Sequence, residues 1–265
     1  MVFFVEQSAT YDARRFEPSE RDVAMKKTAA GWTVIDERHG VLSYKYAFNE
    51  QGATTNCFVA RMGNGQLLVV SPPYRISADA LKDLAAYGEV GALMANNGFH
   101  HLGLAEWRGH FPKARVFAPT DAFARIKKKN PGAPEPEALS GLKELLGADV
   151  TVTEAPATKC GESWTTAKIE GGYAWFGSDI LINLPKVDGP LPMRLMFKLT
   201  KSGPGYRVFN LTMKFTVKDK KQVLTRLAED LRKLPPTVVV PAHGDLLSQA
   251  GLAEETQQLL APFIA

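Results

Sequence analysis

Three short segments, far apart in the sequence, each place ligand-type side chains directly after a β-like apolar run. They are residues 95–104 with His100 and His101, residues 176–179 with Asp179, and residues 240–245 with His243. Three of the chain's five histidines lie in these segments. Side chains that follow strands can meet at one edge of a sheet, and imidazole and carboxylate groups gathered in this way form metal sites. The sequence therefore predicts a fold built on β-sheet, with a candidate metal site where strands end.

Apolar periodicity along the rest of the chain predicts a mixture of strands and helices. Strands are expected at 32–36, 41–48, 56–62, 66–70, 90–94, 115–118, 150–153, 164–169, 173–176 and 237–240. Helices are expected between Ser77 and Gly88 and at 104–110, 122–129, 138–146, 220–234 and 252–260. Proline and glycine interrupt residues 184–205, which receive no assignment. This order predicts an α/β protein with two sheets and helices on their outer faces.

Composition and charge limit the functions that the chain can have. With 265 residues, 45% of them hydrophobic, the chain is long enough for one large domain or two small ones. No apolar run approaches the roughly 20 residues that cross a bilayer, so we expect no membrane partner. The first residues lack the pattern of a secretory signal, and Cys57 and Cys160 form no CxxC pair, so a reducing cytoplasm is the expected location. The net charge of +4 is too small to identify an anionic partner.

The order of elements and two motifs resemble the metallo-β-lactamase superfamily. Residues 97–107 read NxxHHxxLxxW and residues 241–244 read PAHG, and both are similar to motifs of a poorly characterised branch of that superfamily. The resemblance implies an α/β four-layer αββα sandwich over residues 31–265. Residues 1–30, which are charged and weakly periodic, are expected to form an N-terminal arm or an extra element. The branch has no settled activity to carry over.

The chain departs from the superfamily's metal motif, HxHxDHxG. When His101 and Gly103 are aligned with the last His and Gly of that motif, Asn96 and Gly98 replace its first two histidines and His100 replaces its Asp. Residues 118–121, where the superfamily has a third histidine, contain none. The resemblance therefore implies that the ligands of the first metal are missing. An Asp that usually closes the preceding hairpin falls near Ser71, so that carboxylate is also absent.

The resemblance implies that this chain keeps the ligands of the superfamily's second metal. Its expected ligands are His100, His101, Asp179 and His243. Three imidazoles and one carboxylate could hold a single zinc ion, and iron or manganese would accept the same donors. A metal with an open position activates water and polarises a carbonyl or phosphoryl oxygen. The chain is therefore interpreted as a mononuclear metal-dependent hydrolase of a small ester, lactone, thioester or phosphoester.

A second interpretation is a non-catalytic protein that keeps the fold without a metal and uses the cleft for ligand binding or assembly. Asn96 could hydrogen-bond a substrate, although Asn96-Asn97-Gly98 is also ordinary turn chemistry. A basic strip with interleaved aromatic residues at 194–221 could bind an acidic molecule, but a solvated face is the favoured reading and nucleic acid is not the expected partner. The expected partner is a small-molecule substrate or ligand. The sequence leaves self-association into a homo-oligomer open.

Overall fold

The computed structural model describes residues 25–50 and 52–265, whose strands form sheets of seven, four and three strands. The seven-stranded sheet contains β1 (Thr33–Asp36), β2 (Val41–Ala47), β3 (Thr54–Arg61), β4 (Leu67–Val70), β5 (Val90–Met94), β6 (Arg115–Ala118) and β7 (Glu137–Ala138), in that order. β1 to β4 pair antiparallel, and β4 to β7 pair parallel. Because parallel neighbours need crossover connections, helices follow β4, β5 and β6. These helices are α1 (Ala78–Ala85), α2 (Leu104–His110) and α3 (Phe123–Lys129), the last preceded by the short turn η1 (Thr120–Ala122).

The remaining strands form a four-stranded and a three-stranded sheet. The larger one has the order β13-β10-β9-β8 and contains β8 (Val150–Glu154), β9 (Ser163–Ile169), β10 (Gly172–Phe176) and β13 (Pro236–Val240). The smaller one has the order β12-β11-β14 and contains β11 (Leu181–Leu184), β12 (Gly205–Val208) and β14 (His243–Gly244). The helical segments of this half are η2 (Leu139–Leu142), α4 (Lys143–Leu146), α5 (Leu191–Leu199), α6 (Asn210–Thr216), α7 (Lys220–Lys233) and α8 (Leu252–Ile264).

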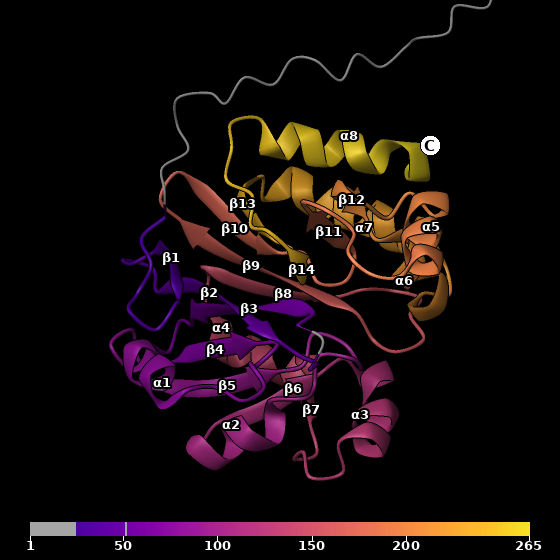
Figure 1. Cartoon of the computed structure of the whole chain (residues 1–265). Coiled ribbons are helices and arrows are strands. Elements are labelled where there is room, and N and C mark those ends of the chain that lie inside the picture. The colour runs from indigo at the N-terminus through magenta and orange to yellow at the C-terminus, as the bar shows by residue number, and fades with distance from the viewer. Residues whose placement is uncertain (1–24, 51) are drawn as a thin grey trace, which may run out of the picture.

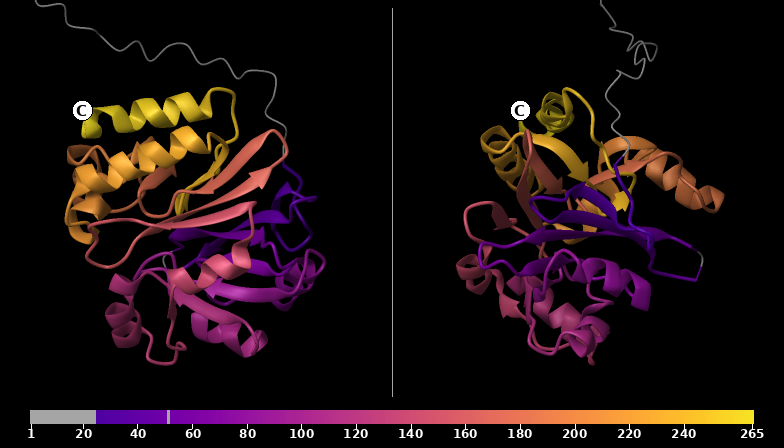
Figure 2. Two further views of the ribbon diagram at one scale, coloured as in Figure 1. Left: turned by 180° about the vertical axis from the view of Figure 1, so that it is seen from behind. Right: turned by 90° about the vertical axis from the view of Figure 1, so that its left-hand side faces the viewer.

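Alternation along the strands divides the core into layers. In β4, Leu68 belongs to the cluster between the two large sheets, whereas Val69 belongs to the cluster beneath α1, α2 and α3. In β10, Phe176 faces the first sheet and Trp175 packs with α7 and α8. Successive side chains of a strand point to opposite faces, so each sheet has one face on its partner sheet and one on helices. The layers are therefore helix, sheet, sheet, helix, as Figures 1 and 2 show.

The predicted α/β class and αββα layering are confirmed. The structure reproduces the predicted bounds of β5, α2 and β6. The strands β7, β11, β12 and β14 and the helices α5 and α6 were not predicted. β7 and β14 have only two residues each, which is too few for a periodic signal, and α5, β11 and β12 lie within or beside the segment 184–205 that proline and glycine interrupt. The predicted helix at 138–146 is instead the end of β7, the 3-10 turn η2 and the single turn α4.

The expected N-terminal arm lies mostly outside the described residues, which begin at Met25. Within 25–30 the chain packs on the domain: Met25 contacts the core between the sheets, and Lys27 forms a β-bridge with Thr33. In the part of the chain that the structure describes, no helix combines the length and apolarity needed to cross a membrane.

Removing the N-cap of α1 is expected to lower stability modestly. The Ser77 side chain accepts a hydrogen bond from the backbone N–H of Ala80 at 3.1 Å. Ser77→Ala leaves that donor without its partner, so we expect the free energy of unfolding to fall by about 1 kcal/mol. Urea denaturation measures the change, and Ser77→Asp, which keeps an acceptor at the cap, should retain most of the stability.

Candidate metal centre

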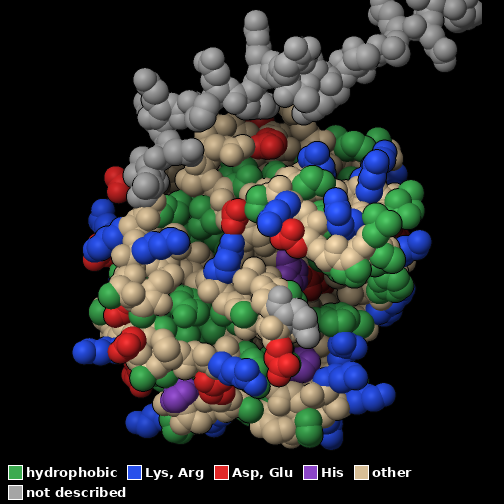
Figure 3. Space-filling model, in the orientation of Figure 1, with side chains coloured by type: hydrophobic (Ala, Val, Ile, Leu, Met, Phe, Trp, Pro, Cys, Tyr) green, Lys and Arg blue, Asp and Glu red, His purple; other side chains and the backbone are tan. Residues whose placement is uncertain are grey.

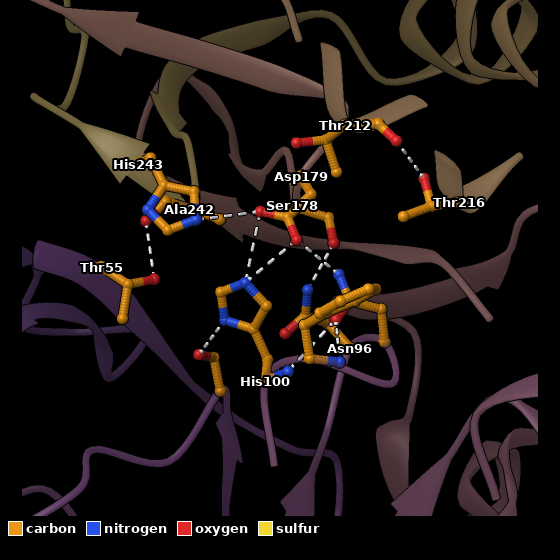
Figure 4. A network of polar contacts seen from close by, with 12 residues as sticks. Thr55, Asn96, His100, Ser178, Asp179, Thr212, Thr216, Ala242 and His243 are labelled. Atoms are coloured by element: carbon orange, nitrogen blue, oxygen red, sulfur yellow. Dashed lines mark hydrogen bonds and ion pairs between the residues drawn. The ribbon is translucent and has the colours of Figure 1, made fainter. Parts of the chain in front are cut away.

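His100 lies in the loop between β5 and α2, where backbone and side-chain contacts fix its ring. Its Nδ1 lies 2.8 Å from Ser71 Oγ, and its backbone N–H donates to Asn97 Oδ1 at 3.2 Å. Gly103 allows the loop to pack closely against the turn that follows β4. Any other residue would place a Cβ 2.3 Å from Pro72 O. The side chain is buried, and its Nε2 is directed toward the second half of the molecule (Figure 4).

Asp179 reaches the same point from the turn after β10. That turn includes Ser178, whose φ of 53° lies in the left-handed region. Asp179 Oδ2 accepts a hydrogen bond from Asn97 Nδ2 at 2.9 Å. Both carboxylate oxygens lie 3.2 Å from His100 Nε2, and Oδ1 lies 3.2 Å from His243 Nε2. The buried carboxylate of Asp179 is therefore in contact with the Nε2 atoms of two imidazoles.

His243 begins β14, in a segment clamped between two sheets. The Thr55 hydroxyl donates to Ala242 O at 2.8 Å, which ties the segment to β3. Gly244 allows the close approach to β11: its φ is 102°, and a Cβ there would lie 1.8 Å from a backbone oxygen of that strand. The His243 ring is anchored through Nδ1, which lies 2.9 Å from Thr54 O. Because its side chain is 22% exposed, this ring is also the one that solvent reaches.

Hydrogen bonding fixes which nitrogen of His243 is free to bind a cation. The carbonyl of Thr54 can only accept, so Nδ1 carries a hydrogen and the neutral ring presents the lone pair of Nε2 to Asp179. A lone pair facing a carboxylate is favourable only when a cation lies with them, either a proton on the ring or a metal ion. The site therefore requires a positive charge between His243 and Asp179.

The donor atoms fit a zinc ion as well as a proton. One ligand atom each from His100, Asp179 and His243 lie within 4.8 Å of one another. Tetrahedral zinc with bonds of about 2.0–2.2 Å needs donor atoms about 3.4 Å apart, close to the 3.2 Å between Asp179 and each imidazole. Two imidazoles and one carboxylate match the three protein ligands typical of catalytic zinc.

The electrostatics of the site keep Asp179 ionised. Burial raises the pKa of its carboxyl, but the charges and hydrogen bonds of His100 and His243 outweigh burial and hold that pKa well below its usual range. For His243, burial lowers the pKa, but the bond to Asp179 prevails and raises it above 6.5. The carboxylate therefore stabilises positive charge on the His243 imidazole in the metal-free protein.

His101 was predicted as a ligand, but the structure does not bring it into this group. The residue is 4% exposed, and its Nδ1 has no hydrogen-bond partner among the described residues. Its backbone oxygen accepts from Asn130 Nδ2 at 2.9 Å. Burial, Arg125 and His100 together lower its pKa. Adjacent residues of a loop project in different directions, and of this pair His100 is the one whose ring faces Asp179.

Asn96, which was predicted to bind substrate, is fully buried and hydrogen-bonds to Ser178 in the turn that carries Asp179. Its side-chain Nδ2 donates to Ser178 Oγ, and its backbone oxygen accepts from Ser163 Oγ at 2.9 Å. Contact between Asn96 and a substrate therefore has no support in this geometry. The amide that does reach the site is the neighbouring Asn97.

Glu162 is a buried carboxyl beside the site that sequence reasoning missed. Asn97 Nδ2 donates to Glu162 Oε1 at 3.1 Å while also donating to Asp179, and the Ser178 hydroxyl donates to the same Oε1. Burial first, and then the charge of Asp179, raise the pKa of Glu162 to about 8. At neutral pH Glu162 is therefore the protonated member of the pair and Asp179 the ionised one. A glutamate just before β9, outside any motif, gives no signal in the sequence.

Zinc affinity is expected to depend on pH through His243. Metal binding requires a neutral imidazole, and Asp179 raises the pKa of His243 above 6.5. Apparent affinity should therefore keep rising with pH through 6.5 and level off only above that value. Competition titrations with a zinc chelator from about pH 5.5 to about pH 8.5 measure this. An affinity that is already level at pH 6.5 would contradict the expected pKa.

Solved structures of other proteins share the architecture of this chain at low sequence identity. No protein-family model matches the chain, and no curated protein matches it. The metallo-β-lactamase FIM-1 from Pseudomonas aeruginosa, in its mono-zinc form, is 14% identical, with a TM-score of 0.51 over 87% of this chain and 94% of that one. The metallo-β-lactamase DIM-1 is 12% identical, with a TM-score of 0.49 over 84% and 94%. A fragment of a putative diflavin flavoprotein from Nostoc sp. PCC 7120 is 11% identical, with a TM-score of 0.49 over 84% and 90%.

The layers, the crossovers and the position of the His–Asp–His group define an αββα protein with a polar centre at its strand ends. Together with the similarity to FIM-1, they show that this chain has the metallo-β-lactamase fold. At such low identity the similarity establishes the fold and not the activity.

Proposed function

We propose that the protein is a metal-dependent hydrolase that holds one zinc ion through His100, Asp179 and His243. The observation that carries the proposal is the convergence of two imidazole Nε2 atoms on one buried carboxylate, each 3.2 Å away, with both rings anchored through Nδ1. FIM-1, which has the same fold, was obtained in a mono-zinc form. Iron or manganese would accept the same donors.

Each residue of the site has a defined part in this proposal. His100 and His243 would donate Nε2, and Asp179 would supply the anionic ligand that its low pKa keeps ionised. Ser71 and Thr54 orient the two rings through Nδ1, as partners behind metal-bound imidazoles commonly do. When bound at such a three-ligand site, zinc supplies Lewis-acid chemistry, making water nucleophilic and polarising a carbonyl or phosphoryl oxygen. The substrates that suit this chemistry are small esters, lactones, thioesters and phosphoesters.

The alternative is a metal-free protein that uses the fold for ligand binding or assembly. The distances of 3.2 Å also suit hydrogen bonds from the two Nε2 atoms to Asp179, and the raised pKa of His243 favours the protonated form of that ring. The two functions differ in the cation that neutralises Asp179, which is a metal ion in the hydrolase and an imidazolium proton in the metal-free protein.

Turnover and metal content together separate these functions. We expect purified protein to carry about one zinc per chain and to hydrolyse at least one of the four ester classes. Dialysis against a chelator should remove activity, and added zinc should restore it. Metal-loaded protein without turnover of any class would favour ligand binding. Protein that binds no metal even after loading would eliminate the hydrolase.

Given its free thiols Cys57 and Cys160, we propose the cytoplasm as its location.

A further inference from the structure

The segment 189–218 carries an apolar surface that the metal centre does not explain. Among the described residues, most large hydrophobic side chains exposed to solvent belong to this segment. They are Leu191, Leu195, Met196 and Leu199 on α5 and Phe215 on α6. Leu191 and Leu199 are each 74% exposed. Scattered exposed leucines need no explanation, but a row of them on one helix marks a contact surface.

The helix α5 is two-sided. Met193, Phe197 and Thr200 are half-buried and face the protein, and Phe197 packs on Phe209 with ring centroids 5.7 Å apart. Leu191, Leu195 and Leu199 recur every four residues, so they form one stripe on a different face of the helix. No residue of α5 is fully buried. The leucine stripe is therefore presented to the surroundings and not to the core.

Positive charge accompanies this stripe. Residues 189–218 contain six basic residues and no Asp or Glu. They are Arg194, Lys198, Lys201, Arg207, Lys214 and Lys218, and all are exposed. Arg194 and Lys198 lie three and seven residues after Leu191, so they flank the leucine stripe on the same helix. Figure 3 shows hydrophobic side chains gathered with Lys and Arg on the right-hand side of the molecule, where Figure 1 places α5 and α6.

We propose that the outward face of α5 docks on an anionic lipid surface. A short helix with leucines on one stripe and Lys or Arg beside it lies in the plane of a membrane, with its apolar stripe among acyl chains and its cations on lipid phosphates. The expectation of no membrane partner rested on the lack of a spanning segment, which a helix lying on the surface does not need. At nine residues, α5 is far too short to span.

Other partners fit this surface less well. A symmetric dimer places the same patch of both copies together, which would bring two sets of these cations into contact. A nucleic acid strand matches the charge, but bases stack on aromatic rings, and the outward stripe of α5 is aliphatic. Only an anionic surface with an apolar interior uses the leucines and the cations together.

Docking through α5 would place the metal centre beside the membrane. Phe197, on the inner side of α5, contacts Phe209, and the Phe209 ring lies 6.2 Å from that of His243. The docking surface is thus connected to a site residue through two aromatic rings. The proposal does not depend on the hydrolase function, because lipid binding can be measured without turnover.

Vesicle sedimentation with the full chain tests the proposal. The probes are phosphatidylcholine vesicles with and without about 30% phosphatidylglycerol. We expect the protein to sediment with the anionic vesicles, not with the neutral ones, and to be released by high salt. Leu195→Ser/Leu199→Ser and Arg194→Glu/Lys198→Glu should each lower the partition coefficient about tenfold.

A matched control uses the basic run of α3. Lys127→Glu/Lys128→Glu removes two exposed cations outside the segment, so it should leave partitioning nearly unchanged. All variants alter exposed positions, and an unchanged melting temperature confirms that they fold. The proposal is overturned if wild type ignores anionic vesicles, or if the α3 control weakens binding as much as the α5 pairs. It is also overturned if the leucine pair instead abolishes a dimer, or if single-stranded DNA binds through the cations while vesicles do not.

Discussion

Replacing His100 by glutamine is expected to abolish stoichiometric zinc binding, whereas the same replacement of the neighbouring His101 is expected to leave it intact. His100 Nε2 lies 3.2 Å from both oxygens of Asp179, while His101 has no place in the ligand group. Loss of a partner that merely orients a ligand costs 10- to 100-fold in metal affinity, so loss of one of three ligands should cost at least about 100-fold.

Elemental analysis and zinc titration of the two variants measure the difference. The pair is closely matched, because both residues lie in one loop and both rings are buried. His101→Gln reports any general damage to that loop, which a melting curve also detects. Zinc loss from His101→Gln with retention in His100→Gln would show that the loop presents the other imidazole. Equal retention in both would remove His100 from the site.

Replacing Glu162 by glutamine is expected to stabilise the metal-free protein increasingly as the pH rises. The pKa of this carboxyl is 4.5 in its reference state and about 8 when folded, because burial and the charge of Asp179 oppose its ionisation. Between these values the folded state binds more protons than the unfolded state. The free energy of unfolding of the wild type therefore falls with rising pH, by up to about 1.4 kcal/mol per unit.

Glutamine cannot ionise, so the variant lacks this loss while keeping the volume and an acceptor oxygen for Asn97 and Ser178. Urea denaturation of chelator-treated protein from about pH 5 to about pH 8 measures the divergence. Glu144→Gln, which changes an exposed carboxyl, is the control and should follow the wild type. Parallel curves for Glu162→Gln and wild type would show that Glu162 is ionised at neutral pH. Metal must be absent, because the charge of an ion would itself shift these pKa values.

The sequence was sufficient to predict the fold because strong periodic signals cover most of the chain. Buried runs such as 90–94 and the amphipathic pattern at 220–234 identify strands and a helix without tertiary information. Residues 184–205 could not be assigned, because proline and glycine interrupt them and because α5, which lies within them, has no fully buried residue. Apolar periodicity predicts a helix from the face that the helix buries, so it gives little signal for α5, which has no fully buried residue.

The site was only partly predictable for a geometric reason. Position after a strand identified Asp179 and His243, and the resemblance supplied their order. Which of two adjacent histidines faces the carboxylate depends on the path of the loop, set by contacts such as Gly103 against Pro72. Glu162 and Ser71 reach the site from distant turns, so only the folded chain shows their roles.

A crystal structure of zinc-soaked protein, with anomalous data collected at the zinc edge, tests the central claim most directly. The account predicts one anomalous peak bonded, at about 2.0–2.2 Å, to Nε2 of His100, Nε2 of His243 and a carboxylate oxygen of Asp179. Direct hydrogen bonds from both imidazoles to Asp179 in the soaked crystal, with no peak between them, would contradict the account and leave the metal-free binding protein as the reading to pursue.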